Sequence, residues 1–232
     1  MKKSPNFALI HLVSQVFEIK MSPLYLFCCI LSFPILPICK ASEFYSLSAK
    51  DILGNQVDFD SLRGKVLMIV NIPFECRFTD SIYEDLKGLT DELSGLDTFR
   101  ILLFMSDEFG GVYQPCDEKQ IRKSKKKISQ LPFQVFKKID VLGTNAHPVF
   151  KYLIKESKIK PDNHFYKYLV EHHGNVAEVF QPRVSVIEEA YDTIFKYVEA
   201  TVNDAMGNMS NMMKELDEEK KGRTKSKKKK GH

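Results

Sequence analysis

The 232-residue chain contains few cysteines and lacks the common motifs of metal and nucleotide binding, and these absences narrow its chemistry. Three of its five cysteines, Cys28, Cys29 and Cys39, lie in an N-terminal apolar segment, which leaves Cys76 and Cys116 for the rest of the chain. Two cysteines are too few for a disulfide-rich scaffold, but they suffice for one bridge or one redox pair. The histidine and cysteine spacings are not those of a zinc site, and the sequence has neither a phosphate-binding glycine loop nor a serine elbow.

Most of the chain also lacks excess positive charge. The formal net charge is +4, but eight positive residues lie among the last thirteen, and subtracting these eight leaves −4 for the remainder. This distribution argues against a nucleic-acid-binding body. We interpret the basic tail as a solubilising segment, with contact to a membrane surface as the alternative.

The N-terminus is typical of a secretory targeting segment. An apolar run over residues 24–33 follows Lys20, and small residues around Ala41 offer a cleavage site. Pro34 and Pro37 argue against one continuous membrane helix, although the apolar stretch is nearly long enough to span a bilayer. An uncleaved membrane anchor therefore stays open as the alternative to a cleaved signal.

We expect three regions along the chain. Residues 1–41 form the signal peptide or anchor, residues 42–202 form the folded domain, and residues 203–232 form a polar, Lys-rich, disordered tail. This organisation predicts a protein of the endoplasmic reticulum lumen or a secreted one, anchored in the membrane if the signal is not cleaved. The glycosylation sequon at Asn208 is consistent with that route.

The hydrophobic pattern after residue 42 alternates between strands and helices. Strands are predicted at residues 44–47, 56–59, 66–71, 99–105, 166–171 and 176–180, with partly extended chain at 133–141, and helices at 79–93, 117–128, 148–155 and 184–202. This alternation predicts an α/β fold in which helices cover both faces of a central mixed sheet. The pair His172 and His173 falls in a hairpin turn and is expected to be solvated.

Cys76 has the most informative position in the sequence. It follows the apolar run Val66–Val70 and precedes Thr79, a good N-cap for the next helix. A thiol just before a helix N-terminus is exposed to the positive end of the helix dipole, which favours the reactive thiolate. The alternative is a buried structural cysteine at the end of a strand.

Several ordered motifs between residues 44 and 198 resemble those of the glutathione peroxidases. The motifs are Gly64-Lys65-Val66 with Val70-Asn71, Cys76-x-Phe78-Thr79, Phe109-Gly110-Gly111 with Gln114-Pro115, Lys138-Ile139-Asp140-Val141 with Asn145-Ala146-His147-Pro148, and Lys167-Tyr168-Leu169-Val170. The resemblance implies a thioredoxin-like fold, and the short spacing from Tyr152 to Phe165 resembles that of monomeric, phospholipid-hydroperoxide members. The signal segment looks most like that of endoplasmic-reticulum members, and His147 is expected to be structural.

The resemblance further implies that Cys76 reduces peroxides as a thiolate. The Gln, Trp and Asn that assist it in the family correspond here to Glu108, Asn163 and His164, and the chain contains no tryptophan at all. An ionised Glu108 cannot donate hydrogen bonds and would raise the thiol pKa. A neighbouring His164 would counter this by taking the proton, and Glu108 would orient the imidazole. Cys76, His164 and Glu108 then form a hypothetical Cys-His-carboxylate site, and a decayed site is the alternative.

The resemblance leaves the source of reducing equivalents open. Ser124 stands where thioredoxin-using members carry a resolving cysteine, so Cys116 is either a substitute or an incidental surface thiol. We expect no cofactor or metal, with glutathione or a disulfide-isomerase-like dithiol protein as co-substrate. The first hypothesis is a thiol peroxidase for hydrogen peroxide or lipid hydroperoxides, acting in the response to oxidative stress. The alternatives are an inactive, redox-sensitive binding partner and a thiol–disulfide exchange protein using Cys76 and Cys116.

Overall fold

A computed structural model describes residues 43–73, 81–110, 119 and 130–229, all within the unit Ala41–His232. Its main element is a five-stranded sheet in the order β5-β4-β3-β6-β7. The strands are β3 (Val66–Pro73), β4 (Phe99–Ser106), β5 (Gln134–Phe136), β6 (Lys167–Val170) and β7 (Val176–Phe180). β3 pairs in parallel with β4, and β4 with β5, whereas β6 is antiparallel to both β3 and β7. The predicted mixed sheet is therefore confirmed.

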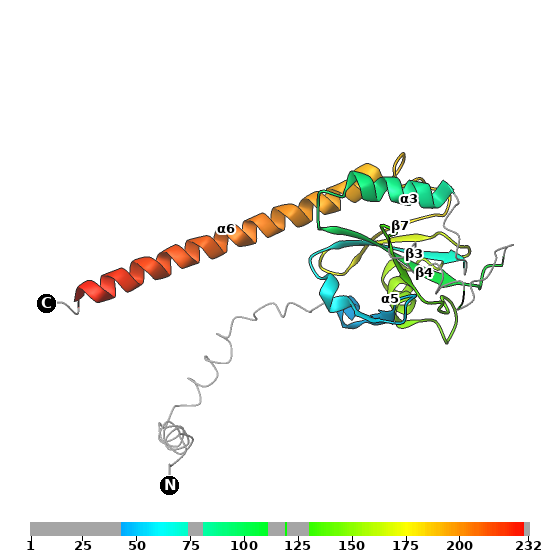
Figure 1. Ribbon diagram of the computed structural model, residues 1–232, viewed down its shortest axis with the longest axis horizontal. Coiled ribbons are helices and arrows are strands. Elements are labelled where there is room, and N and C mark those ends of the chain that lie inside the picture. Colours follow the sequence, from blue (N-terminus) through cyan, green and yellow to red (C-terminus); the bar gives the residue numbers. More distant parts are fainter. Residues whose placement is uncertain (1–42, 74–80, 111–118, 120–129, 230–232) are drawn as a thin grey trace, which may run out of the picture. The chain divides into compact units, whose positions relative to one another are not determined.

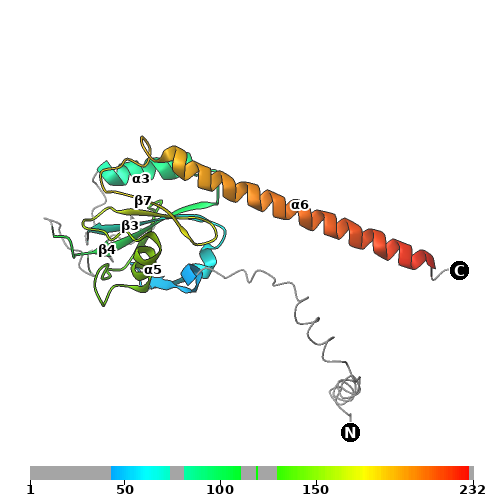
Figure 2. The same ribbon diagram turned by 180° about the vertical axis from the view of Figure 1, so that it is seen from behind.

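Helices cover both faces of this sheet, as Figures 1 and 2 show from opposite sides. β3 is buried along its whole length, so its alternate side chains enter two different cores. Met68 and Val70 pack in the core with α3 (Ser81–Glu92) and the first turns of α6 (Tyr191–Lys229). Leu67 and Ile69 pack in the other core with α5 (Pro148–Ser157).

The chain enters the domain through a 3-10 turn, η1 (Glu43–Ser46), where the sequence pattern predicted a strand over 44–47. Both Phe44 and Tyr45 are buried here. In a strand these consecutive side chains would point to opposite faces, whereas a tight turn lets both face the core. The short strands β1 (Ser48–Lys50) and β2 (Gln56–Asp58) then form a hairpin that continues into a second 3-10 turn, η2 (Phe59–Leu62).

α6 begins later than the residue pattern predicted, at Tyr191 instead of Val184. Competing hydrogen bonds account for the difference. The Asp85 carboxylate on α3 accepts from the backbone nitrogen of Val186 at 2.8 Å and from the Ser185 hydroxyl at 2.7 Å. The buried Lys167 ammonium also donates to the carbonyls of residues 181, 182 and 184. These bonds hold the segment as a series of turns.

α6 also continues to Lys229, where the sequence led us to expect a disordered tail from residue 203. Residues 203–221 are exposed, so packing does not explain this part of the helix. The stretch contains no proline and is rich in Lys, Glu and Met, which favour helix even without tertiary contacts. Among the helices that the structure describes, none is both long enough and apolar enough to cross a membrane.

Candidate functional site

Three segments of the chain meet at the carboxyl ends of β3 and β4. The parallel register places Pro73 beside Ser106, so the chain leaves both strands at the same edge of the sheet. Antiparallel β6 begins at this edge, because Lys167 pairs with Val70. In open α/β sheets this edge is where ligands usually bind. Cys76 follows Pro73 by three residues, but it lies outside the described residues, as does Cys116.

Asn71 holds the segment before β6 against the end of β3. Its side-chain Nδ2 donates to the carbonyl of Asn163 at 2.9 Å, and its Oδ1 accepts from the backbone nitrogen of Tyr166 at 3.0 Å. Its own carbonyl accepts from the backbone nitrogen of Phe165 at 2.6 Å. Asn71 is fully buried. One side chain and its backbone therefore fix the position of His164, which lies between these bonded residues; we call this arrangement the Asn71 clamp.

The clamp also holds an unfavourable backbone conformation. Phe165 has a φ of 69°, in the left-handed region that residues with a Cβ rarely adopt. Its ring packs edge-on to Tyr83 at 5.7 Å between centroids, which adds a side-chain restraint to the backbone hydrogen bond. Such backbone outliers persist only where the surroundings determine them, and they often occur at functional sites.

His164 is buried among aromatic rings, with only 1% of its surface exposed. The Phe109 ring lies edge-on to the imidazole at 5.2 Å between centroids, and the Phe165 ring lies at 6.4 Å. Burial lowers the pKa of His164, and the Gly110 backbone and the charges of Asp107 and Glu108 offset part of that effect. At neutral pH the imidazole is therefore neutral and able to accept a proton.

Glu108 follows β4 at the same edge, but its hydrogen bonds go to a different part of the chain. Its carboxylate accepts from the backbone nitrogens of Val141 and Leu142, the latter at 3.0 Å, and from the Ser106 hydroxyl at 3.2 Å. These bonds fix the segment after β5 to the end of β4. On His164 the carboxylate acts through its charge, as a minor contribution.

Asn163 has a structural role within its own segment. Its Oδ1 accepts from the backbone nitrogen of His164 at 2.8 Å, and its carbonyl is bound by the Asn71 side chain. Of the predicted site residues, Glu108, Asn163 and His164 thus come from the two described loops at this edge. Sequence reasoning missed Asn71 as a site residue, although an amide in the otherwise apolar run of β3 was a visible signal.

Two other histidines, His147 and His172, make contacts that test their predicted roles. His147 caps α5, as its Nδ1 accepts from the backbone nitrogen of Val149 at 3.3 Å, which agrees with the predicted structural role. The prediction that His172 is solvated is wrong. Its side chain is only 14% exposed, because Asp204 of α6 covers it and binds Nε2 at 2.9 Å. The sequence pattern does not reveal this contact, since 32 residues separate the two partners.

Fold and site together define an α/β protein of the thioredoxin-like class with a candidate site at the carboxyl edge of its sheet. The crystal structure of Trgpx in apo form matches it with a TM-score of 0.54 and 25% identity, over 68% of this chain and 97% of that one. The crystal structure of T. cruzi GPX1 has the same TM-score at 22% identity, over 68% of this chain and 97% of that one. The predicted fold class is confirmed.

The chain belongs to the glutathione peroxidase family. The family model for glutathione peroxidase matches residues 44–154. Glutathione peroxidase 7 of Homo sapiens is 39% identical over 146 residues, which cover 63% of this chain and 77% of that protein. A probable phospholipid hydroperoxide glutathione peroxidase of Encephalitozoon cuniculi (strain GB-M1) is 36% identical over 169 residues, 69% of this chain and 92% of that one. The predicted family is confirmed, and with it the general class of peroxidase.

Proposed function

We propose that this protein is a thiol peroxidase in which Cys76 is the reacting group. The Cys76 thiolate attacks one oxygen of the hydroperoxide, the O–O bond breaks, and the leaving oxygen departs with a proton as water or an alcohol. Cys76 becomes a sulfenic acid. A first thiol condenses with it, releasing water and forming a mixed disulfide, and a second thiol restores the Cys76 thiol and leaves as a disulfide.

The observation that carries this proposal is the convergence of chain segments at the end of β3. The Asn71 clamp and the register of β4 bring both candidate-site loops to the edge where the chain runs toward Cys76. Three residues of extended chain reach at most about 11 Å, so Cys76 follows Pro73 within that distance. Membership of the peroxidase family supports the same reaction class.

His164 is the proposed proton acceptor for the Cys76 thiol. Its lowered pKa keeps the imidazole neutral at neutral pH, which a general base requires. Glu108 has a different part in this proposal from the orienting role that the sequence suggested. Its hydrogen bonds fix the segment after β5 to the end of β4, and its charge stabilises the imidazolium once the proton has moved.

The experiment compares the wild type with Cys76→Ser and, as the matched control, Cys116→Ser. After a pulse of hydrogen peroxide or a lipid hydroperoxide, mass spectrometry with a sulfenic-acid trap should find the label on Cys76. We expect Cys76→Ser to lose peroxide consumption and Cys116→Ser to keep it. Equal activity of both variants would refute the role of Cys76. A Cys76–Cys116 bridge after the pulse would identify an internal resolving thiol, and disulfide exchange without peroxide would favour the exchange function.

The proposal extends to the reductant, with glutathione and a dithiol protein of the disulfide-isomerase type as the two candidates. Steady-state turnover with each reductant at matched thiol concentration decides between them. If sulfenic acid forms but neither reductant supports turnover, the result would favour a redox-sensitive binding partner over an enzyme. Sedimentation of the purified protein tests the expected monomeric state.

We further propose a secretory-pathway location. The exposed residue Asn208 of the sequon lies on the exposed part of α6, where a glycosyltransferase has access. A glycosidase-sensitive mass on Asn208 after expression in animal cells would support passage through the lumen. An unmodified, cytosolic protein in the same cells would contradict it.

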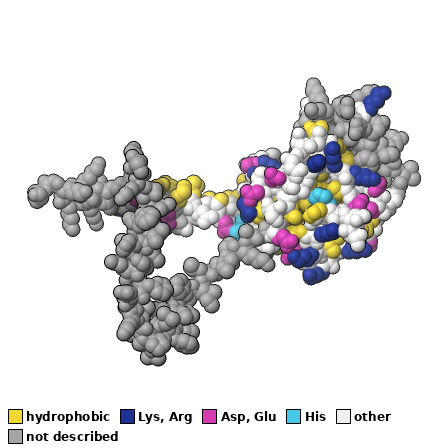
Figure 3. Space-filling model, turned by 90° about the horizontal axis from the view of Figure 1, so that it is seen from below, with side chains coloured by type: hydrophobic (Ala, Val, Ile, Leu, Met, Phe, Trp, Pro, Cys, Tyr) yellow, Lys and Arg dark blue, Asp and Glu magenta, His cyan; other side chains and the backbone are white. Residues whose placement is uncertain are grey.

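The exposed part of α6 supports contact with an anionic membrane surface as a further proposal. It carries large apolar side chains in water, namely Met206, Met209, Met212, Met213 and Leu216. The eight basic residues of the C-terminus follow directly in sequence. In contrast, Lys, Arg, Asp and Glu side chains are interspersed over the globular part in Figure 3. Co-sedimentation with vesicles containing phosphatidylserine, but not with neutral vesicles, is the expected result, and removal of residues 220–232 should abolish it.

A further inference from the structure

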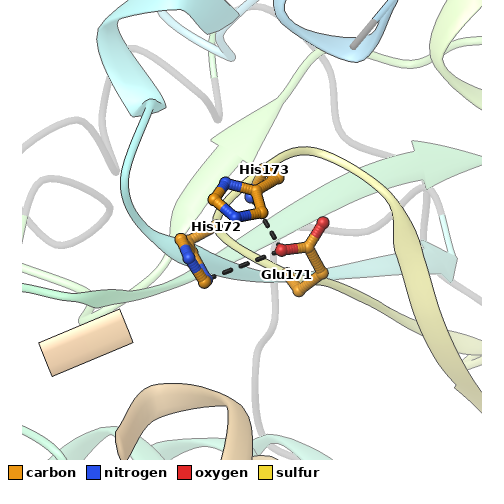
Figure 4. Close-up of side chains that lie close together, drawn as sticks. All are labelled: Glu171, His172 and His173. Atoms are coloured by element: carbon orange, nitrogen blue, oxygen red, sulfur yellow. Dashed lines mark hydrogen bonds and ion pairs between the residues drawn. The ribbon is translucent and has the colours of Figure 1, made fainter. Parts of the chain in front are cut away.

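The turn between β6 and β7 gathers three metal-binding side chains at the end of β6 opposite the candidate peroxidase site. They are Glu171, His172 and His173, and one ligand atom from each lies within 4.8 Å of the other two (Figure 4). Asp204 joins this cluster from α6 through its 2.9 Å contact with Nε2 of His172. Two imidazoles and two carboxylates therefore meet where the hairpin contacts the helix.

The hydrogen bonds of His172 leave one of its nitrogens facing an acceptor. An ionised Asp204 can only accept, so we assign the proton of the neutral imidazole to Nε2. Nδ1 then presents a lone pair to Oε2 of Glu171, at 3.5 Å. Nδ1 is buried, without a hydrogen-bond partner in the described part of the chain. A positive charge between these two electron-rich atoms, supplied by a second proton or by a metal ion, would make their contact attractive.

The turn itself holds Glu171 ready for a ligand. Its Oε2 accepts from the backbone nitrogen of His173 at 2.8 Å, and its Oε1 accepts from the backbone nitrogen and the side chain of Asn175 at 3.0 and 2.7 Å. These bonds fix the carboxylate but leave one lone pair on Oε2. His173 is exposed, its ring centroid lies 4.0 Å from that of His172, and one of its ring nitrogens already lies within 4.8 Å of the other two ligand atoms.

The cluster borders an open hollow of ≈ 530 Å³ rather than the close-packed core. His172, His173 and Asp204 line it together with Thr201 and Asn208 of α6. A metal ion bound at the edge of this hollow, next to His172 and His173, would have space for a water molecule as a further ligand. Several α6 residues of the lining carry polar side chains that suit a hydrated cation, namely Thr201, Asn203, Asp204, Asn208 and Asn211.

We propose that this junction binds a divalent transition-metal ion, with Zn²⁺ as the best match. Nδ1 of His172, one imidazole nitrogen of His173 and Oε2 of Glu171 are the ligands, and water completes the tetrahedron. Zinc bonds of about 2.0–2.2 Å place tetrahedral ligand atoms about 3.4 Å apart, close to the 3.5 Å between Nδ1 and Oε2. Asp204 is the positioning residue, because its hydrogen bond to Nε2 fixes the tautomer and the ring orientation.

Metal binding would connect the hairpin turn to α6 through Asp204. Ligand that binds only the folded protein stabilises it in proportion to the logarithm of its concentration above the dissociation constant. We therefore expect Zn²⁺ to raise the melting temperature of the protein and to slow amide exchange around residue 204. The site is separate from Cys76, so these effects do not depend on peroxidase activity.

The test uses the untagged full-length protein with all cysteines alkylated, because free thiolates also bind zinc. Calorimetric titration with ZnCl₂ should give one equivalent bound. His173→Asn should weaken binding at least tenfold, and Asp204→Asn about 10- to 100-fold. His232→Asn is the matched control, with unchanged binding expected. Since His173 is exposed, its variant should fold normally.

Two results would overturn the proposal. One is zinc binding that is absent, or equally strong in the wild type and His173→Asn. The other is a nitrogen NMR spectrum at neutral pH in which both nitrogens of His172 carry protons with ZnCl₂ present. That spectrum would show that a second proton, and not a metal ion, separates the two acceptors. Cobalt substitution with visible absorption typical of tetrahedral coordination, lost in His173→Asn, would support the ligand set.

Discussion

The two ends of β6 each lie close to a histidine, and the two surroundings are opposite in character. Before the strand, His164 is buried among aromatic rings, and the Asn71 clamp satisfies the backbone around it. After the strand, His172 lies between the carboxylates of Glu171 and Asp204, beside an open hollow. Burial thus favours the neutral imidazole of His164 before the strand, whereas the two carboxylates around His172 favour a cation after it.

The largest expected effect comes from breaking the Asn71 clamp. Asn71→Leu removes both side-chain hydrogen bonds and leaves the buried backbone nitrogen of Tyr166 without its acceptor. We expect the free energy of unfolding to fall by about 2–4 kcal/mol, since an unsatisfied buried group costs about 1–3 kcal/mol. Urea denaturation measures this change. Asn211→Leu on the exposed part of α6 is the control, and an equal loss in both variants would contradict the clamp.

Lys167, the first residue of β6, should make stability depend on alkaline pH. Burial lowers its pKa to about 8, partly offset by Asp85 and Glu189. Between that pKa and the unfolded value of 10.5, the unfolded chain binds more protons, so stability rises with pH in this window. We expect a gain of about 1.5 kcal/mol from pH 8 to 9.5. Denaturation of Lys167→Met should lack that gain, and parallel pH curves for the two proteins would rule the effect out.

The free energy of unfolding in acid should also depend on His164, with a smaller effect than that of Lys167. Its pKa lies below the ordinary value of 6.5 because of burial, so below that pH the unfolded chain takes up more protons than the folded one. The free energy of unfolding should therefore fall between pH 7.5 and 5.5. His164→Gln should show a shallower fall, with part remaining because burial also lowers the pKa of His147. Identical slopes would show that His164 does not titrate differently on folding.

The smallest effect is expected from Asp204→Asn in metal-free buffer. Asp204 is 57% exposed, and its pair with His172 should contribute less than about 1 kcal/mol. Thermal unfolding in the presence of a chelator checks this value. A loss as large as that of Asn71→Leu would mean that the two ends of β6 depend on their polar contacts to the same degree.

The sequence predicted the order of the elements well and the polar contacts poorly. Strands β3, β4 and β7 and helix α5 follow the predicted ranges closely, because apolar periodicity and a proline at the first helical turn are local signals. The start of α6 was misplaced because Asp85 and Lys167 act on it from distant positions in the chain. Residue patterns do not contain such contacts.

The candidate site shows the same division. The order of motifs and the residue types at positions 108, 163 and 164 were readable from the sequence, and so was the family. Two contacts depend instead on strand register. Glu108 accepts hydrogen bonds from the backbone of residues 141–142, and Asn71 holds the segment that contains His164.

Amino-acid order by itself determined the fold class and the family and led to the proposal that Cys76 is the reacting thiol, since all three follow from local patterns. Only the tertiary structure decided which histidine is neutral and buried and which lies between two carboxylates. The physical reason is that desolvation and hydrogen bonding depend on neighbours in space, and those neighbours lie as many as 127 residues apart in the chain.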